Sequence, residues 1–203
     1  MEYGVDNSSG NLVVNLTKIY TRTGDDGTTS LGDMSRTGKN DPRLKAYADV
    51  DEANCAIGVI LATCEVREDI AALLLSIQND LFDVGADLCT PIKDEESGSL
   101  RITDAYVERL ETACDRYNEG LESLRSFVLP GGTPAAAHMH VARTVSRRAE
   151  RSTWAALDAY HGGMNPIAAT YLNRVSDLLF ILSRVANQDG IGDVLWKPGG
   201  TNS

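Results

Sequence analysis

Five stretches of this 203-residue chain repeat their apolar residues at the spacing of an α-helix. They lie at about residues 44–64, 67–88, 103–124, 134–160 and 166–188. Thr133 and Pro134 are typical of an N-cap and a first helical residue, and the last stretch is apolar around most of its circumference, which indicates a central helix. Only 6% of the residues are aromatic, so the core must consist mainly of small and aliphatic side chains. The sequence therefore predicts an all-α, five-helix bundle.

The bundle is expected to form one domain over residues 18–198, between a flexible leader at 1–17 and a short tail at 199–203. Within this domain, residues 18–43 are rich in Gly, Thr and Asp and are predicted to be loop-like.

A net charge of −10 argues against a general nucleic-acid surface or an anionic-membrane surface, so an anionic ligand must be held by a local cluster. The cysteines lack C-x-x-C spacing and are expected to be reduced thiols of a cytoplasmic protein: Cys55, Cys64, Cys89 and Cys114. No signal segment or membrane-length apolar run is present. His138 and His140 are too close in sequence to share a helix face, so no structural metal is expected.

Four arginines lie within nine positions of the predicted fourth helix. Arg143, Arg147 and Arg151 line up along one side, with Arg148 and Glu150 beside them. Because stacked like charges destabilise a helix, the cluster indicates an anionic ligand such as a polyphosphate. The alternative is a solvated basic face in which Glu150 is the intrahelical partner of Arg147.

Two further segments carry groups suited to phosphate chemistry. The stretch 21–31 combines glycines, hydroxyls and Arg22, with Lys39 nearby, but it lacks the Walker A spacing and is also compatible with an ordinary surface loop. On the fifth helix, Asn173 and Asp177 share a face, where they could pair with an arginine or offer oxygen to phosphate-bound Mg²⁺. For Asp177, a buried structural hydrogen bond is the favoured interpretation.

Two single residues are further candidates. Asp51 precedes an apolar run, so it is expected to be partly buried and to need an arginine, for which Arg143 is a candidate. Phe127 stands just before the turn 130–132, where most such residues plug the core.

The segments 18–31, 41–54, 127–133, 142–151 and 171–177, taken together and in this order, resemble the PduO-type ATP:cob(I)alamin adenosyltransferases. The resemblance spans residues 18 to about 198. It implies a homotrimer of five-helix bundles that binds ATP and Mg²⁺ between neighbouring subunits and transfers the 5′-deoxyadenosyl group to cob(I)alamin. A cobalamin-dependent mutase is a candidate partner.

The resemblance also implies residue roles. To ATP it assigns Thr21, Arg22, Thr23, Gly24, Thr29, Ser30, Lys39, Arg147, Arg148, Glu150, Arg151 and Asn173. Asn173 would also place Mg²⁺, and Arg147, Asn173 and Phe127 would carry the catalytic roles. On the corrinoid side, Phe127 would press on the lower face of the corrin, and Asp51 and Arg143 would form a supporting ion pair.

Two other functions fit the same residues. A non-catalytic trimeric nucleotide sensor or corrinoid escort would use the same phosphate site without chemistry. A plain helical scaffold would not bind ATP at all.

Overall fold

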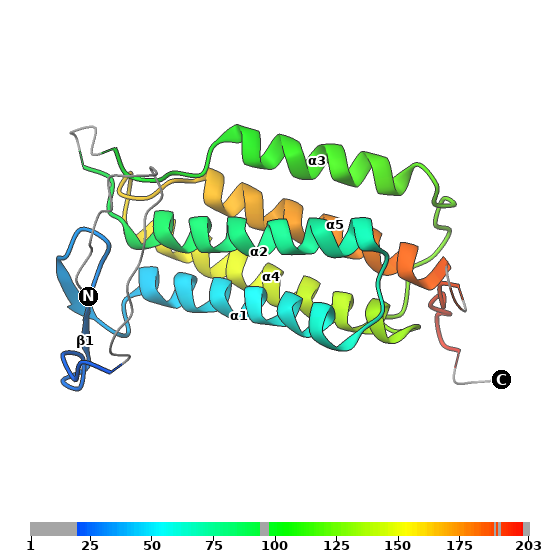
Figure 1. The fold of residues 1–203 in the computed structure, drawn as a ribbon, viewed down its shortest axis with the longest axis horizontal. Coiled ribbons are helices and arrows are strands. Elements are labelled where there is room, and N and C mark those ends of the chain that lie inside the picture. Colours follow the sequence, from blue (N-terminus) through cyan, green and yellow to red (C-terminus); the bar gives the residue numbers. More distant parts are fainter. Residues whose placement is uncertain (1–19, 94–97, 189, 191, 201–203) are drawn as a thin grey trace.

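The structure of the protein, a computed structural model, describes residues 20–93, 98–188, 190 and 192–200, so the predicted leader lies outside the described residues. Five helices make up most of it: α1 (Pro42–Thr63), α2 (Glu68–Cys89), α3 (Asp104–Asn118), α4 (Pro134–Ala159) and α5 (Ile167–Gln188). They run roughly side by side in Figure 1. The predicted five-helix bundle is confirmed.

Capping residues set where the helices begin and end. The predicted N-cap Thr133 is confirmed, because its hydroxyl accepts a hydrogen bond from the backbone N–H of Ala136. The third helix ends six residues before the predicted position 124. There the backbone N–H of Leu121 closes a turn on the carbonyl of Asn118, and Gly120 within that turn disfavours helix.

The core is centred on α5, which packs against α4, α3 and α2, while α1 packs against α4 and α2. The buried side chains of α5 include Tyr171, Leu172, Val175, Leu178, Leu179 and Leu182. The prediction that the fifth helix is central is therefore confirmed. In Figure 1, α3 lies along the outer edge of the bundle.

A small β-hairpin precedes the bundle, at a segment predicted to be loop-like. Strand β1 (Thr28–Ser30) pairs antiparallel with β2 (Arg36–Gly38), and Thr29 lies opposite Thr37. Strands of three residues are too short to show an alternating pattern, so they could not be predicted from the sequence. Figure 1 shows the hairpin at the end of the bundle where α1 begins.

A buried arginine and a carboxylate tie this hairpin to the bundle. Arg43, only 1% exposed, donates to the carbonyl oxygens of Leu88 at 2.9 Å and Gly163 at 3.1 Å. Its guanidinium lies 4.5 Å from the ring centroid of Tyr160. The Tyr160 hydroxyl donates to Asp41, which also accepts the Thr37 hydroxyl at 2.7 Å. Strand β2, the start of α1 and the end of α4 are thus joined.

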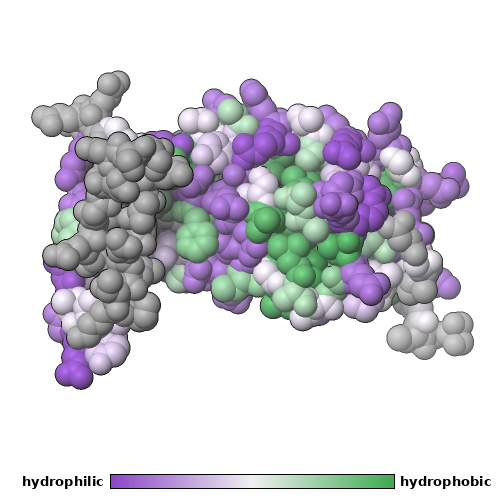
Figure 2. Space-filling view, in the orientation of Figure 1, coloured by the Kyte–Doolittle hydropathy of each residue, from purple (hydrophilic) through white to green (hydrophobic). Residues whose placement is uncertain are grey.

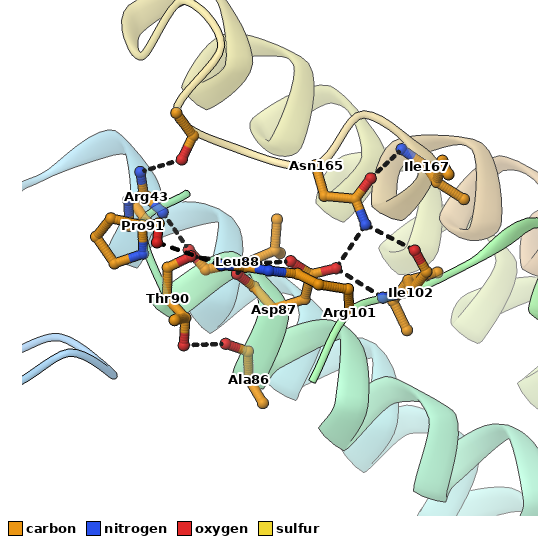
Figure 3. A network of polar contacts seen from close by, with 11 residues as sticks. Arg43, Ala86, Asp87, Leu88, Thr90, Pro91, Arg101, Ile102, Asn165 and Ile167 are labelled. Atoms are coloured by element: carbon orange, nitrogen blue, oxygen red, sulfur yellow. Dashed lines mark hydrogen bonds and ion pairs between the residues drawn. The ribbon is translucent and has the colours of Figure 1, made fainter. Parts of the chain in front are cut away.

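Next to this junction, the buried carboxylate of Asp87 fixes the chain between α2 and α5, as Figure 3 shows. It accepts hydrogen bonds from Arg101 at 2.6 Å, from the backbone N–H of Ile102 at 2.8 Å and from the Asn165 amide at 2.7 Å. Three donors satisfy a charge that would be costly to bury alone. The network therefore holds the loops around the end of α2 in place.

At the opposite end of the bundle, Asn187 at the end of α5 holds the turn that leads into α4. Its amide donates to the carbonyl of Gly131 at 3.1 Å and accepts from the backbone N–H of Thr133 at 3.0 Å. Gly132 between them has φ +107°, and a Cβ there would lie 2.0 Å from the Asn187 oxygen. Only glycine fits this position.

One face of the bundle carries apolar surface, seen in Figure 2 as a green area among hydrophilic residues. The large apolar side chains that α1 and α2 expose are Tyr47, Val59, Leu75 and Phe82. Within the described part of the chain, no helix has both the length and the hydropathy needed to cross a membrane.

Replacing Gly132 by Ala tests the turn. The variant is expected to lose about 2–4 kcal/mol of unfolding free energy, because the new Cβ meets Asn187 and the backbone φ is unfavourable for alanine. Urea denaturation measures this loss. Gly120→Ala, where a Cβ meets nothing within 4 Å, is the matched control and should change stability by less than about 1 kcal/mol. Equal effects of the two substitutions would contradict the assignment.

Candidate functional site

The turn 21–24 before β1 displays hydroxyls and backbone groups on the surface. The hydroxyls of Thr21 and Thr23 share a hydrogen bond of 2.9 Å, and Arg22 between them has φ 62°. A left-handed residue in a tight turn lets successive N–H groups face one side, which is the geometry of anion-binding concavities. Arg36 of β2 donates to the Thr23 carbonyl at 2.8 Å and so fixes the turn against the hairpin.

Lys39 brings a positive charge to the same turn. Its Nζ lies 3.2 Å from the point that a Cβ on Gly24 would occupy, so the missing side chain leaves room for the ammonium group. The backbone N–H of Lys39 donates to the carbonyl of Gly27 at 2.9 Å. Thr29 and Ser30 lie on β1 of the same hairpin. The structure therefore brings the predicted N-terminal phosphate donors onto one element.

Three of the four α4 arginines, Arg147, Arg148 and Arg151, differ in whether a carboxylate pairs with them. Arg147 and Arg151 are exposed, and neither forms an ion pair with any described residue. Arg148 is instead held by two carboxylates of α1: it pairs with Asp49 at 3.4 Å and makes a shorter contact with Glu52. The α4 surface therefore offers two exposed guanidinium groups, those of Arg147 and Arg151, whose charge is not neutralised within the described chain.

A shallow cavity of about 310 Å³ lies where α4 faces the first turns of α1. Its lining residues are Pro42, Lys45, Arg148, Arg151, Ser152 and Ala155. Pro42 follows β2 closely, so the root of the hairpin and the arginine helix meet at this cavity within a single chain. Three cationic side chains line it, and it is suited to an anionic group.

Asp49 organises the wall of the cavity. It accepts the ammonium of Lys45 at 3.1 Å and also the hydroxyl of Ser152. Burial raises the pKa of Asp49, but these hydrogen bonds and the charges of Lys45 and Arg148 bring it below its usual value overall. Asp49 therefore stays ionised and holds the cationic side chains in place.

Asn173 and Glu150 join α5 to α4 near the middle of the bundle. The Asn173 amide donates to Glu150 Oε1 at 3.2 Å. The alternative that Glu150 serves as an intrahelical partner of Arg147 is therefore wrong. The interpretation of Asp177 as a buried structural hydrogen bond is also wrong, because its side chain is 46% exposed and pairs with Arg174 at 2.6 Å. Asn173 and Asp177 share a helix but not a common partner.

Asp51 is exposed, so the expectation of partial burial is wrong. The α1 carboxylates that face α4 are Asp49 and Glu52, three residues apart, and Asp51 points about 100° away from Glu52 around the helix. Within the described chain, Asp51 and Arg143 form no ion pair with each other or with any other residue. Arg143 is half-buried, and its Nε lacks a hydrogen-bond partner. Each side chain of the expected pair therefore lacks its partner within one chain.

Phe127 is 77% exposed, which excludes the interpretation that it plugs the core. It lies on a segment that pairs with the C-terminal part of the chain through a bridge between Val128 and Leu195. In Figure 1 this C-terminal part is at the end of the bundle opposite the hairpin. The 26 residues of α4, about 39 Å long, separate the two ends.

Sequence reasoning missed several residues around the cavity: Lys45, Asp49 and Ser152. Lys45 and Asp49 are four residues apart just inside the first helix, a spacing that favours an ion pair. This signal was available in the sequence. The role of Ser152 was not, because it depends on how α1 and α4 pack.

Comparison with known proteins gives consistent matches. A sequence model described as cobalamin adenosyltransferase matches residues 19–186. A corrinoid adenosyltransferase of Mycobacterium tuberculosis is 63% identical over 190 residues, which cover 93% of this chain and 97% of that protein. One from Bacillus subtilis is 40% identical over 184 residues, which cover 89% and 92%.

Solved structures also match over most of the chain. A phenylalanine-to-alanine variant of a PduO-type ATP:corrinoid adenosyltransferase from Lactobacillus reuteri, complexed with cobalamin and ATP, has a TM-score of 0.82 at 36% identity, covering 89% of this chain and 99% of that one. An arginine-to-lysine variant complexed with ATP has a TM-score of 0.79 at 34% identity, covering 88% and 100%.

Asp41→Ala tests how firmly the hairpin is held. It removes the N-cap of α1 and the acceptor for Tyr160 and Thr37, so unfolding free energy is expected to fall by about 1–3 kcal/mol at about pH 7. Burial raises the pKa of Asp41, but hydrogen bonds from Tyr160 and Thr37 lower it overall. A folded-state pKa below the unfolded value of about 3.9 gives stability that is present above that value and lost as pH falls through the folded-state pKa.

The difference between wild type and Asp41→Ala should therefore be smaller at about pH 3 than at about pH 7 in urea denaturation. Asp158→Ala, at an exposed position of α4, is the control and should change stability by less than about 0.5 kcal/mol. A pH-independent difference would show that the Asp41 charge does not hold the hairpin.

Proposed function

The chain belongs to the cobalamin adenosyltransferase family, and we propose that it transfers the 5′-deoxyadenosyl group of ATP to cob(I)alamin, giving adenosylcobalamin and triphosphate. The observation that carries this proposal is the pair of exposed arginines on α4, Arg147 and Arg151, which form no ion pair with any described residue. A triphosphate is the part of ATP that such a cationic surface recognises.

The reaction needs no protein nucleophile. Cobalt(I) attacks C5′ of the ribose, the cobalt–carbon bond forms with two electrons from cobalt, and the C5′–O bond breaks with its electron pair leaving on triphosphate. The corrinoid brings this chemistry, and the protein supplies position and charge. Holding cobalt and C5′ in line lowers the barrier by up to about 7–11 kcal/mol.

We assign the phosphate donors to the hairpin and α4. The hairpin contributes Thr21, Arg22, Thr23, Gly24, Thr29, Ser30 and Lys39, and α4 contributes Arg147, Arg148 and Arg151. Glu150 belongs to the same site as the acceptor that holds Asn173. Negative charge grows on the triphosphate as the C5′–O bond breaks. Donors already fixed around it stabilise the transition state more than the substrate. Arg147 and Arg151 are the key members because both are exposed and neither is neutralised within the described chain.

The residues present fit Mg²⁺ bound together with ATP phosphates. Asn173 uses the nitrogen side of its amide for Glu150, which leaves Oδ1 as the coordinating atom. Magnesium prefers oxygen ligands and commonly takes only one or two from the protein when phosphates supply others. Bound there, it would neutralise charge on the triphosphate. Glu150 orients Asn173 for this role.

A site shared between subunits of a homotrimer would bring together two binding regions that lie far apart within one chain. A nucleotide at the hairpin and a corrin at Phe127 of the same chain would lie at opposite ends of the bundle, too far apart for cobalt to reach C5′. A neighbouring subunit that brings its Phe127 end to this hairpin removes the separation. Arg147, Arg151 and the exposed Trp154 share one face of α4, and Arg and Trp are enriched at the centres of protein interfaces.

The same arrangement would allow Asp51 and Arg143 to form the expected ion pair between two subunits. Asp51 is exposed and Arg143 has an unpartnered Nε within the described chain, so a pair across the subunit boundary would satisfy both. We assign this pair, with Phe127, to the corrinoid side of the site. Phe127 would occupy the lower face of the corrin and keep the axial base from cobalt, which favours cobalt(I).

We place the protein in the cytoplasm, since its four cysteines are free thiols that suit a reducing compartment. A cobalamin-dependent mutase is the class of partner that would take up the product.

Incubation with ATP, Mg²⁺ and chemically reduced cobalamin tests the function. The spectrum of adenosylcobalamin should appear together with free triphosphate. ATP binding without this product would show a sensor or escort in place of an enzyme.

Arg147→Ala tests the triphosphate assignment. Loss of one transition-state donor is expected to cost about 3 kcal/mol, or roughly a hundredfold in kcat. Steady-state kinetics with saturating ATP measures it. Arg116→Ala, at an exposed arginine of α3 far from these residues in sequence, should leave kcat within about twofold. Near-normal turnover of Arg147→Ala would remove the arginine from the mechanism.

Mixing two inactive variants tests the shared site. If the hairpin of one subunit meets the α4 face of its neighbour, trimers mixed from Lys39→Ala and Arg147→Ala chains regain intact sites at about one quarter of positions. Activity after co-refolding measures this. Mixing Arg147→Ala with Arg151→Ala is the matched control, since both changes lie on α4 and no intact site can form. No gain from the first mixture would place both elements in one chain.

A further inference from the structure

The segment that carries Phe127 is paired with the C-terminal segment 194–196 along its length. The Leu129 N–H donates to the Val194 carbonyl at 2.8 Å, and the Trp196 N–H donates to the Phe127 carbonyl at 2.7 Å. The Ser126 hydroxyl donates to the carbonyl of Trp196 at 2.7 Å. These bonds form a short two-stranded ribbon, and its C-terminal strand lies beyond the range that the family model matches.

Buried polar residues at the end of α5 hold the root of this ribbon. Asp193 accepts Arg184 Nε at 2.8 Å, and both side chains are about nine-tenths buried. Arg184 also donates to the carbonyl of Glu122 at 2.7 Å, and Glu122 precedes the strand that carries Phe127. Asn187 donates to Asp193 at 3.3 Å and also holds Gly131. Both strands are therefore fixed to one helix end before they reach the surface.

Beyond this root the ribbon exposes an apolar surface. Its exposed large side chains are Phe127, Leu129, Val194, Leu195 and Trp196. The ring of Phe127 lies against that of Trp196, with centroids 6.0 Å apart and planes tilted by 56°. This geometry is within the range of favourable aromatic pairs. Among the residues that the structure describes, Trp196 is the one aromatic ring that lies against Phe127.

We propose that Trp196 is a positioning residue of the corrinoid site, which holds the Phe127 ring against the lower face of the corrin. This rests on the proposed function. An exposed phenylalanine has freedom to change rotamer, and a ring that must keep an axial base away from cobalt works only if it stays in one orientation. Trp196, fixed by the backbone pairing of its own strand, supplies that restraint.

Trp196→Ala tests the proposal through the axial base itself. In the presence of ATP and cob(II)alamin, the absorption spectrum reports the fraction of bound corrinoid whose lower base has left cobalt. We expect this fraction to fall. When a chemical one-electron reductant is added to reduce cob(II)alamin to cob(I)alamin, adenosylation should slow by about three- to tenfold, the effect of losing one aromatic pair. KM for ATP should not change. Trp196→Phe should restore most of both readouts.

Cobinamide, a corrinoid without the nucleotide base, separates positioning from a general structural role. With it there is no nucleotide base to displace, only a weakly bound water, so Trp196→Ala should slow adenosylation of cobinamide much less than that of cobalamin. Phe127→Ala is the reference and should show a larger loss with cobalamin while ATP binding is retained. Phe82→Ala, which removes another exposed aromatic ring on α2, should match wild type.

An unchanged base-displaced fraction in Trp196→Ala would overturn the proposal, as would an equal loss of rate with cobalamin and cobinamide. If wild type adenosylates neither corrinoid, the proposed function fails, and the role of Trp196 fails with it.

Discussion

The candidate site depends first on a guanidinium buried at the end of the bundle. Arg43 satisfies carbonyl oxygens of Leu88 and Gly163 and stacks on Tyr160, while Asp41 beside it receives the Tyr160 hydroxyl. An arginine left in that position without these partners would be costly to bury, and the carbonyls would lose their donors. The contacts therefore fix the hairpin root, the first turn of α1 and the end of α4 in one arrangement. This junction therefore fixes the position of the hairpin residues to which we assign the triphosphate.

The second constraint is distance. The bundle places the hairpin, to which we assign the triphosphate, and the exposed Phe127 at opposite ends of a helix about 39 Å long. Alkyl transfer from a nucleotide to cobalt requires direct contact between the reacting atoms. A single chain cannot meet both conditions, whereas neighbouring chains can. Arg147 and Arg151, exposed on α4 between the two ends, would then face the partner subunit, which accounts for charges that the described chain leaves unpaired.

Much of this architecture could be predicted because the deciding signals are local. Thr133 and Pro134 marked the start of α4, and the apolar circumference of α5 marked it as central. The hairpin was missed because strands of three residues carry no periodicity. The prediction that Asp51 is partly buried was wrong for a different reason. The sequence does not show which of several neighbouring carboxylates faces α4, and only the packing of α1 places Asp49 and Glu52 there. The hydrogen bond between Asn173 and Glu150 could not be predicted for the same reason, because it depends on how α5 packs against α4.

A crystal structure of the protein with ATP and Mg²⁺ tests the central claim most directly. The account predicts that the triphosphate contacts Lys39 and the 21–24 turn of one subunit together with Arg147 of its neighbour. A triphosphate held by the hairpin alone, with Arg147 of every chain far from it, would contradict the account.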